Sequence, residues 1–229
     1  MSFDNLTFKI DPELARRIVE GLRRSATAAI RLAQLGWTVP MWATPGQVVE
    51  ILKSGEEATV DDRFVAIYSS GGGEVFQRLV RDLVSQPPLV KWHPLIHQCV
   101  EAYHREHFQI TIPSLLTIIE GILAHSAADN GTRLIRLAHS KVAQLENDGP
   151  NRIIFVIWQT IETFVTELFA KAPFLGPRRQ VINRHWILHG RDATTWTQAD
   201  SLRLFQAIHT VSQVAFEDFR EKIGENSNY

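Results

Sequence analysis

The stretch ITIPSLLTIIEGILAHSA, residues 110–127, consists almost entirely of apolar or small residues. A run of this kind predicts a helix that is buried on most of its faces, so we place this helix at the centre of the core. Pro113 fits the first turn of such a helix, where its missing N–H would have no intrahelical partner in any case. The run therefore favours a fold of packed helices.

Glu120 is the one carboxylate in this run. A buried carboxylate without a partner is costly, so we expect Glu120 to meet a cation or several hydrogen-bond donors. Arg184 is the partner we predict. Two alternatives stay open: Glu120 lies on a narrow solvent-exposed stripe, or it pairs with a structural arginine such as Arg133 or Arg136.

Apolar residues recur at helical spacing in the other long segments, and no stretch alternates convincingly with period two. Asp11-Pro12, Thr44-Pro45 and Thr197 are start signals for helices. Gly71-Gly72-Gly73 is expected to form a flexible turn, because it lacks the Lys-Ser/Thr of a phosphate-binding loop. Helices are predicted over 12–35, 45–52, 59–68, 74–84, 93–106, 110–127, 132–146 and 152–172, from Gly176-Pro177 through the segment 183–190, and after 197.

Pro87-Pro88 interrupts this pattern and is the best candidate for a domain boundary. The sequence therefore predicts an all-α protein with an N-terminal helical region, residues 1–88, followed by a helical bundle, residues 89–229. The first helix is amphipathic, with several arginines off its apolar stripe. These arginines could touch RNA or an acidic partner, although a solvated face is the simpler interpretation.

The composition excludes several classes of protein. The formal net charge of the 229 residues is −1, so any contact with RNA has to come from a local basic patch. The single cysteine, Cys99, excludes an intramolecular disulfide framework and suits a reducing compartment. The longest uncharged apolar runs fall short of the roughly 18 residues of a membrane span, and Met1-Ser2-Phe3-Asp4-Asn5 lacks the layout of a signal peptide. We therefore expect a cytoplasmic protein without membrane contact.

The residues most suited to chemistry lie in Asn183-Arg184-His185-Trp186-Ile187-Leu188-His189-Gly190. Arg184 is a permanent cation whose planar fork suits phosphate, and both histidines can titrate near neutral pH. On an ideal helix His185 and His189 share a face, whereas Arg184 and His189 lie about 140° apart. Arg184 and His189 could meet if the helix starts or stops inside the segment, if the arginine curls around, or if two copies meet in a dimer.

Spacing alone does not single out this pair. Four other Arg/His pairs have comparable spacing: Arg133/His139, Arg178/His185, Arg179/His185 and Arg203/His209. In context, however, the segment resembles the R-polar-x3-H motif of the HEPN superfamily, helical proteins that include many metal-independent RNA endonucleases of bacterial defence and toxin systems. The upstream segment that ends in Glu120-Gly121-Ile122 is similar to a pattern in bacterial and phage HEPN-like proteins, and the resemblance covers about residues 90–223.

The resemblance implies a HEPN-type bundle that acts as an endoribonuclease without metal ion or cofactor. His189 would be the acid/base and Arg184 the phosphate clamp, while Glu120 would orient Arg184 or a histidine. Asn183 and His185 would supply hydrogen-bond donors or set a tautomer. The family also implies a homodimer that brings two motifs together over one RNA strand, and a regulatory or antitoxin protein as a further partner.

Two alternatives compete with this interpretation. Arg184 could simply neutralise Glu120 while His189 caps a helix ahead of Gly190, in a non-catalytic scaffold that binds a protein or RNA partner. A mononuclear metal site is the other, because His97, Glu101 and His104 share one face of a predicted helix. A dinuclear site would need a second Glu-x-x-His, and the sequence contains none.

Overall fold

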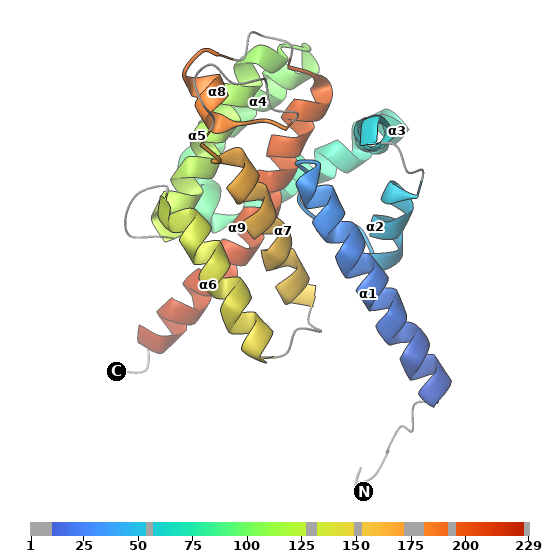
Figure 1. Ribbon diagram of the computed structural model, residues 1–229. Helices are drawn as coiled ribbons and strands as arrows, with labels where there is room; N and C mark the ends of the chain where they lie inside the picture. Colours follow the sequence, from blue (N-terminus) through green and yellow to red (C-terminus); the bar gives the residue numbers. More distant parts are fainter. Residues whose placement is uncertain are drawn as a thin grey trace, which may run out of the picture.

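The computed structural model describes residues 11–53, 57–126, 132–148, 153–171, 181–191 and 196–226. All the regular structure in these residues is helical, as the sequence predicts, and none of them forms a strand. None of the described helices is both long and apolar enough to cross a bilayer. Figure 1 shows the helices gathered around a central pair, with the first and last helices extending past the others at one end.

The central pair consists of α5 (Phe108–Ser126) and α9 (Gln198–Asn226). Five apolar residues of α5 are completely buried, which confirms its predicted place in the core: Ile112, Leu115, Leu116, Ile118 and Ile119. Every side chain of α9 from Ser201 to Ser212 is also buried, so this stretch of the helix has no exposed face. Two long helices therefore share the centre, and most others pack against them.

Pro113 does not lie in the first turn of α5, because the helix already begins at Phe108. An interior proline removes its own N–H bond to the preceding turn and crowds the carbonyl four residues earlier, although its fixed φ is compatible with a helix. Glu106, with φ 60°, reverses the chain between α4 (His93–His104) and α5. The helix can start directly after this reversal, and α4 ends two residues earlier than predicted.

The N-terminal helices begin at the predicted capping residues. In α1 (Pro12–Gln34) the Asp11 side chain accepts a hydrogen bond from the N–H of Glu13 at 3.0 Å. In α2 (Pro45–Leu52) Thr44 forms a capping box with Gln47. The third helix, α3 (Glu57–Ser85), starts at Glu57 rather than Thr59. The expected break at Gly71-Gly72-Gly73 is present as a turn within α3, since all three glycines have positive φ.

The remaining elements complete the bundle. They are the 3₁₀ helix η1 (Pro87–Trp92), α6 (Thr132–Asp148), α7 (Ile153–Leu168) and α8 (Arg184–Leu188). Helix α7 ends four residues short of its predicted end, and the predicted breakers Pro173 and Gly176-Pro177 lie outside the described residues. Helix α1 packs on α2 and α7, while α3 packs on α9. A domain boundary at Pro87-Pro88 stays a prediction.

Candidate functional site

The residues of the 183–190 segment are held by a short helix rather than a long one. Helix α8 spans only Arg184–Leu188, and His189 is its C-cap. Of the arrangements that the sequence allows, the helix therefore starts and stops inside the segment. Arg184 and His189 lie at opposite ends of it.

Asn183 fixes α8 to the end of α7. Its side-chain oxygen accepts a hydrogen bond from the N–H of Trp186 at 3.3 Å, as an N-cap does. Its amide nitrogen donates to the carbonyl of Glu167 at 3.2 Å and to that of Ala170 at 2.9 Å. The side chain is buried, and both of its amide hydrogens are bonded to backbone carbonyls. Asn183 thus positions the site, and it contacts neither histidine through a hydrogen bond.

Arg184 forms the predicted ion pair with Glu120 of α5. Its Nε donates to one carboxylate oxygen of Glu120, and its Nη2 donates to the other at 3.3 Å. The two side chains remain 30% and 32% exposed, so Glu120 is less buried than its apolar neighbours in the sequence suggest. A guanidinium carries five N–H donors, and two are taken here. Arg184 can therefore still bind an anion while Glu120 holds it in place.

The two histidines lie side by side on the surface of α8. Their ring planes are 7° from parallel and their centroids 6.0 Å apart. Partial burial lowers the pKa of His185. The neighbouring groups Arg184, His189 and Lys171 lower this pKa further, whereas the Glu120 carboxylate raises it. His185 is therefore mainly neutral at pH 7 and can accept a proton.

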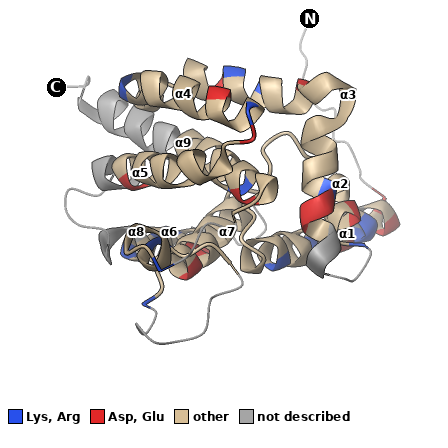
Figure 2. Cartoon of the chain, turned by 90° about the horizontal axis from the view of Figure 1, so that it is seen from above, with Lys and Arg blue, Asp and Glu red and all other residues tan. Residues whose placement is uncertain are grey.

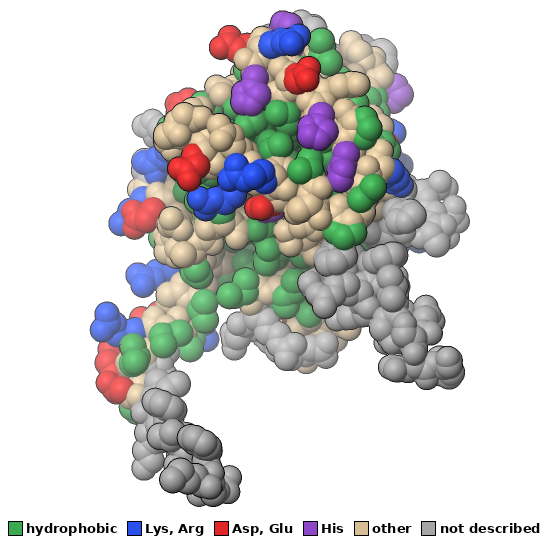
Figure 3. All heavy atoms as spheres, turned by 180° about the vertical axis from the view of Figure 1, so that it is seen from behind, with side chains coloured by type: hydrophobic (Ala, Val, Ile, Leu, Met, Phe, Trp, Pro, Cys, Tyr) green, Lys and Arg blue, Asp and Glu red, His purple; other side chains and the backbone are tan. Residues whose placement is uncertain are grey.

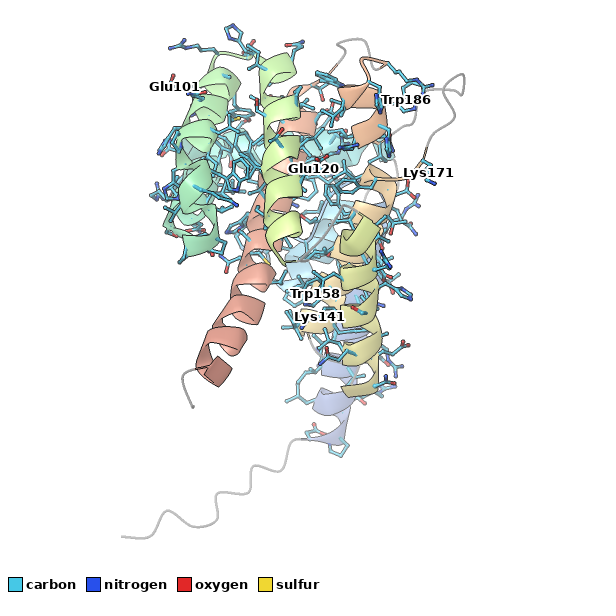
Figure 4. All side chains as sticks on the ribbon, turned by 90° about the vertical axis from the view of Figure 1, so that its left-hand side faces the viewer. Glu101, Glu120, Lys141, Trp158, Lys171 and Trp186 are labelled. Atoms are coloured by element: carbon cyan, nitrogen blue, oxygen red, sulfur yellow. The ribbon has the colours of Figure 1, made fainter. Side chains whose placement is uncertain are left out.

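Further cations surround this helix. The Arg191 guanidinium lies over the Trp186 ring, 4.4 Å from its centroid, and Trp186 and Ile187 anchor α8 in the core. Figure 4 shows Glu120 on the side of α5 that faces α8, with Trp186 and Lys171 on the α8 side and Glu101 on the outer side of α4. Figure 2 shows basic residues on α8 and in the chain beyond it. The charge at this place is locally positive although the whole chain is nearly neutral.

The residues proposed for a metal lie elsewhere. His97, Glu101 and His104 are exposed on α4. In the part of the chain that the structure describes, no group of three His, Cys, Asp or Glu residues is arranged to hold a metal ion. The alternative site on α4 thus gains no support from the geometry.

Of the other Arg/His pairs, Arg203 and His209 are buried in α9. The Arg203 side chain pairs with Asp61 of α3 and with Asp200. His139 is exposed and bonds Glu162 at 2.7 Å. Arg178 and Arg179, and the side chain of Arg133, lie outside the described residues.

Sequence reasoning missed a buried polar network along α9. Besides the Arg203 pairs, the side-chain oxygen of Gln206 accepts a hydrogen bond from the Tyr68 hydroxyl at 2.7 Å, and its side-chain nitrogen donates to the backbone carbonyl of Thr38. The Thr210 hydroxyl donates to the carbonyl of Val39 at 3.0 Å. The available signal was a polar row, Arg203, Gln206 and Thr210, at helical spacing on an otherwise apolar helix. This network joins α9 to α3 and to the segment that follows α1.

Comparisons with known proteins add no relative. No family model matches the chain, and neither the curated proteins nor the solved structures contain a significant match.

Proposed function

We propose that the α8 surface binds RNA and cleaves its phosphodiester backbone without a metal ion. The observation that carries the proposal is the grouping of His185 and His189, side by side, with an arginine that Glu120 holds in place. Such cleavage needs a base, an acid and a cation near one phosphate, and these residues supply all three.

In this mechanism the neutral His185 removes the proton of the ribose 2′-hydroxyl. The 2′-oxygen then attacks the phosphorus, and the bond to the 5′-oxygen breaks. His189 in its protonated form gives a proton to the leaving 5′-oxygen. The free N–H donors of Arg184 bind the non-bridging oxygens, on which negative charge develops. The products are a 2′,3′-cyclic phosphate and a 5′-hydroxyl.

The resemblance to HEPN proteins extends this proposal. It supports a HEPN-type bundle and a cytoplasmic effector of bacterial or phage defence or a toxin, controlled by a regulatory or antitoxin protein. It also supports a homodimer that places two α8 surfaces over one RNA strand. The local excess of Arg184, Arg191 and Lys171 over Glu120 is compatible with RNA as the ligand.

The test is cleavage of total and structured RNA in EDTA by wild type, His185→Ala and His189→Ala. We expect each substitution to reduce the rate by on the order of 100-fold, because each removes one proton-transfer group. His139→Ala is the matched control, since His139 is an exposed histidine on α6 that also contacts a glutamate. Full activity in a His185→Ala/His189→Ala double variant would refute the mechanism.

A second candidate is a non-catalytic scaffold, and the Glu120–Arg184 pair is the observation that favours it. If this pair serves only to fasten α8 to α5, no RNA is cleaved by wild type. Because both side chains are about a third exposed, Arg184→Ala then costs only about 1 kcal/mol of stability. RNA cleavage that is lost in Arg184→Ala while the protein stays folded would exclude the scaffold.

A further inference from the structure

Helices α2 and α3 border an open hollow on one side of the bundle. Its volume is about 960 Å³, and its walls come from α2, from the segment before α2 and from both limbs of α3. The two limbs are the parts of α3 before and after the turn at Gly71-Gly72-Gly73. Figure 1 shows α2 and α3 next to each other, and Figure 3 shows basic side chains along the side of the molecule from which α1 projects. A hollow of this size has room for a small organic ligand.

Arg63 is the residue of this hollow that is best placed to hold an anion. Its Nη1 donates to the backbone carbonyls of Glu50 at 3.0 Å and Ile51 at 2.9 Å, at the end of α2. Within the described residues no carboxylate pairs with Arg63, and its Nε and Nη2 have no hydrogen-bond partner. Nε and Nη2 form the edge with which an arginine binds two oxygens of one anion. The bonds to α2 therefore hold the guanidinium in place and leave this edge for a ligand.

Two further cations line the hollow from different elements. Lys53 follows the last turn of α2 and pairs with Glu50 at 2.6 Å, whereas Arg78 lies on the second limb of α3, 3.7 Å from Glu74. All four side chains are more than half exposed, so both pairs are weak and the cations can turn to another anion. Three cations around one hollow suit a phosphate group better than a carboxylate, because a phosphate has three terminal oxygens and up to two negative charges.

The rest of the hollow suits a flat ring. Trp42 is half-buried in its wall, and a hydrogen bond of 3.4 Å from the indole N–H to the Tyr68 hydroxyl orients the ring. Ile67 and Val75 add apolar surface beside it. Gln47 also lines the hollow, and because its side-chain oxygen is used in the cap of α2, its amide nitrogen is left for a ligand. A nucleobase has acceptors for this nitrogen, whereas a phenyl ring has none.

We propose that this hollow binds a nucleoside monophosphate, either as a free nucleotide or as the 5′-phosphorylated end of an RNA strand. Arg63 binds two oxygens of the phosphate through its free edge, and Lys53 and Arg78 contact the phosphate from two other directions. The base packs against Trp42. A nucleoside alone leaves the cations without an anion, and inorganic phosphate leaves the apolar wall uncovered, so the complete ligand binds most tightly. No residue of α8 lines the hollow, and the inference does not depend on the chemistry there.

The test is isothermal titration calorimetry of the full chain with AMP, GMP, CMP and UMP. At least one of them is expected to bind with a dissociation constant on the order of 10 µM, an ordinary affinity for a ligand of this size. The corresponding nucleoside and inorganic phosphate should each bind at least about tenfold more weakly. A short 2′-O-methyl RNA, which lacks the attacking hydroxyl, distinguishes the two sources. If the ligand is a strand end, this RNA with a 5′-phosphate binds more tightly than the mononucleotide and than the same RNA with a 5′-hydroxyl.

Two single substitutions locate the ligand within the hollow. Arg63→Lys keeps a charge that can bond the carbonyls at the end of α2 but loses the two-donor edge, so the dissociation constant should rise about tenfold or more. Trp42→Leu removes the aromatic surface against which the base packs, and a rise of about tenfold is expected. Thermal unfolding verifies that each variant is folded.

A double substitution keeps the test valid if Arg63→Lys or Trp42→Leu does not fold. Lys53→Gln/Arg78→Gln removes two cations whose side chains are more than half exposed, so the fold should be unaffected while the dissociation constant rises about tenfold. Arg16→Gln/Arg81→Gln is the matched control. It removes the same charge from two exposed arginines that do not line the hollow, and it should leave the affinity unchanged.

Three results would overturn the proposal. One is the absence of binding by all four nucleotides and by the 5′-phosphorylated RNA up to about 1 mM, about 100 times the expected dissociation constant. Another is an affinity that Lys53→Gln/Arg78→Gln leaves unchanged, or lowers no more than Arg16→Gln/Arg81→Gln does, which would place the nucleotide at a different site. The third is a nucleoside, or inorganic phosphate, that binds as tightly as the nucleotide.

Discussion

Gly121→Ala should destabilise the protein even though alanine is the better helix former. Gly121 lies in α5 beside Glu120, against the indole of Trp92 from η1. A Cβ at this position would lie 2.1 Å from Trp92 Cζ2 and 2.9 Å from Cη2. The glycine therefore allows the indole to lie directly on the backbone of α5.

Two opposing effects determine the size of this loss. Replacing a helical glycine with alanine favours folding by about 1 kcal/mol. To reach an ordinary contact of 3.4 Å, however, the ring and helix must separate by about 1.3 Å. Overpacking of this kind costs about 1–3 kcal/mol, and the size of the required separation puts the cost at the upper end of this range. The net loss is about 2 kcal/mol, or about 4–8 °C in melting temperature for a chain of this length.

The assay is urea unfolding followed by circular dichroism at low micromolar protein, where association does not contribute. Gly21→Ala is the matched control, because Gly21 is also helical and a Cβ there would meet nothing within 4 Å. It should stabilise the protein by about 0.5–1 kcal/mol. In a Trp92→Leu background the cost of Gly121→Ala should largely disappear. Stability equal to or above that of wild type in Gly121→Ala would refute the reasoning.

Three further substitutions test the interior and the site. Arg203→Met removes the partner of two carboxylates and should lower the free energy of unfolding in urea by about 3 kcal/mol. Arg16→Met, at an exposed ion pair, should lower it by less than about 0.5 kcal/mol, and equal losses would contradict this. Asn183→Ala should cost about 2 kcal/mol, because α8 loses its cap and its bonds to α7, and an unchanged midpoint would count against that role. Burial lowers the pKa of His209 below 6.5, and Asp82 opposes this. Its contribution is therefore present above about pH 6.5 and decreases as the pH falls through the lowered pKa, so His209→Gln should flatten the loss of stability from about pH 7 to about pH 5; an unaltered slope would exclude His209 as a cause.

The candidate site shows how far a sequence argument reaches. The lone carboxylate of an apolar run required a partner, and Arg184 was the one predicted, with Arg133 and Arg136 kept as alternatives; the structure shows the Glu120–Arg184 pair, across 64 residues. The same reasoning overestimated the burial of Glu120, because exposure depends on how closely α8 covers α5. The short length of α8 was also not evident from the sequence, because its N-cap, Asn183, is held in place by hydrogen bonds to the end of α7. Whether the site is catalytic stays a prediction.

By itself, the sequence determined the helical class and most helix starts, because capping bonds join residues within about four positions of each other. Thr197 shows this directly, since its hydroxyl accepts from the N–H of Asp200 at 3.3 Å. Only the tertiary structure decided which polar residues of α9 are buried. Arg203 meets Asp61 across 142 residues, and Gln206 meets Tyr68 across 138. A buried polar group is stable only where its partner is brought to it, and packing of distant helices selects that partner.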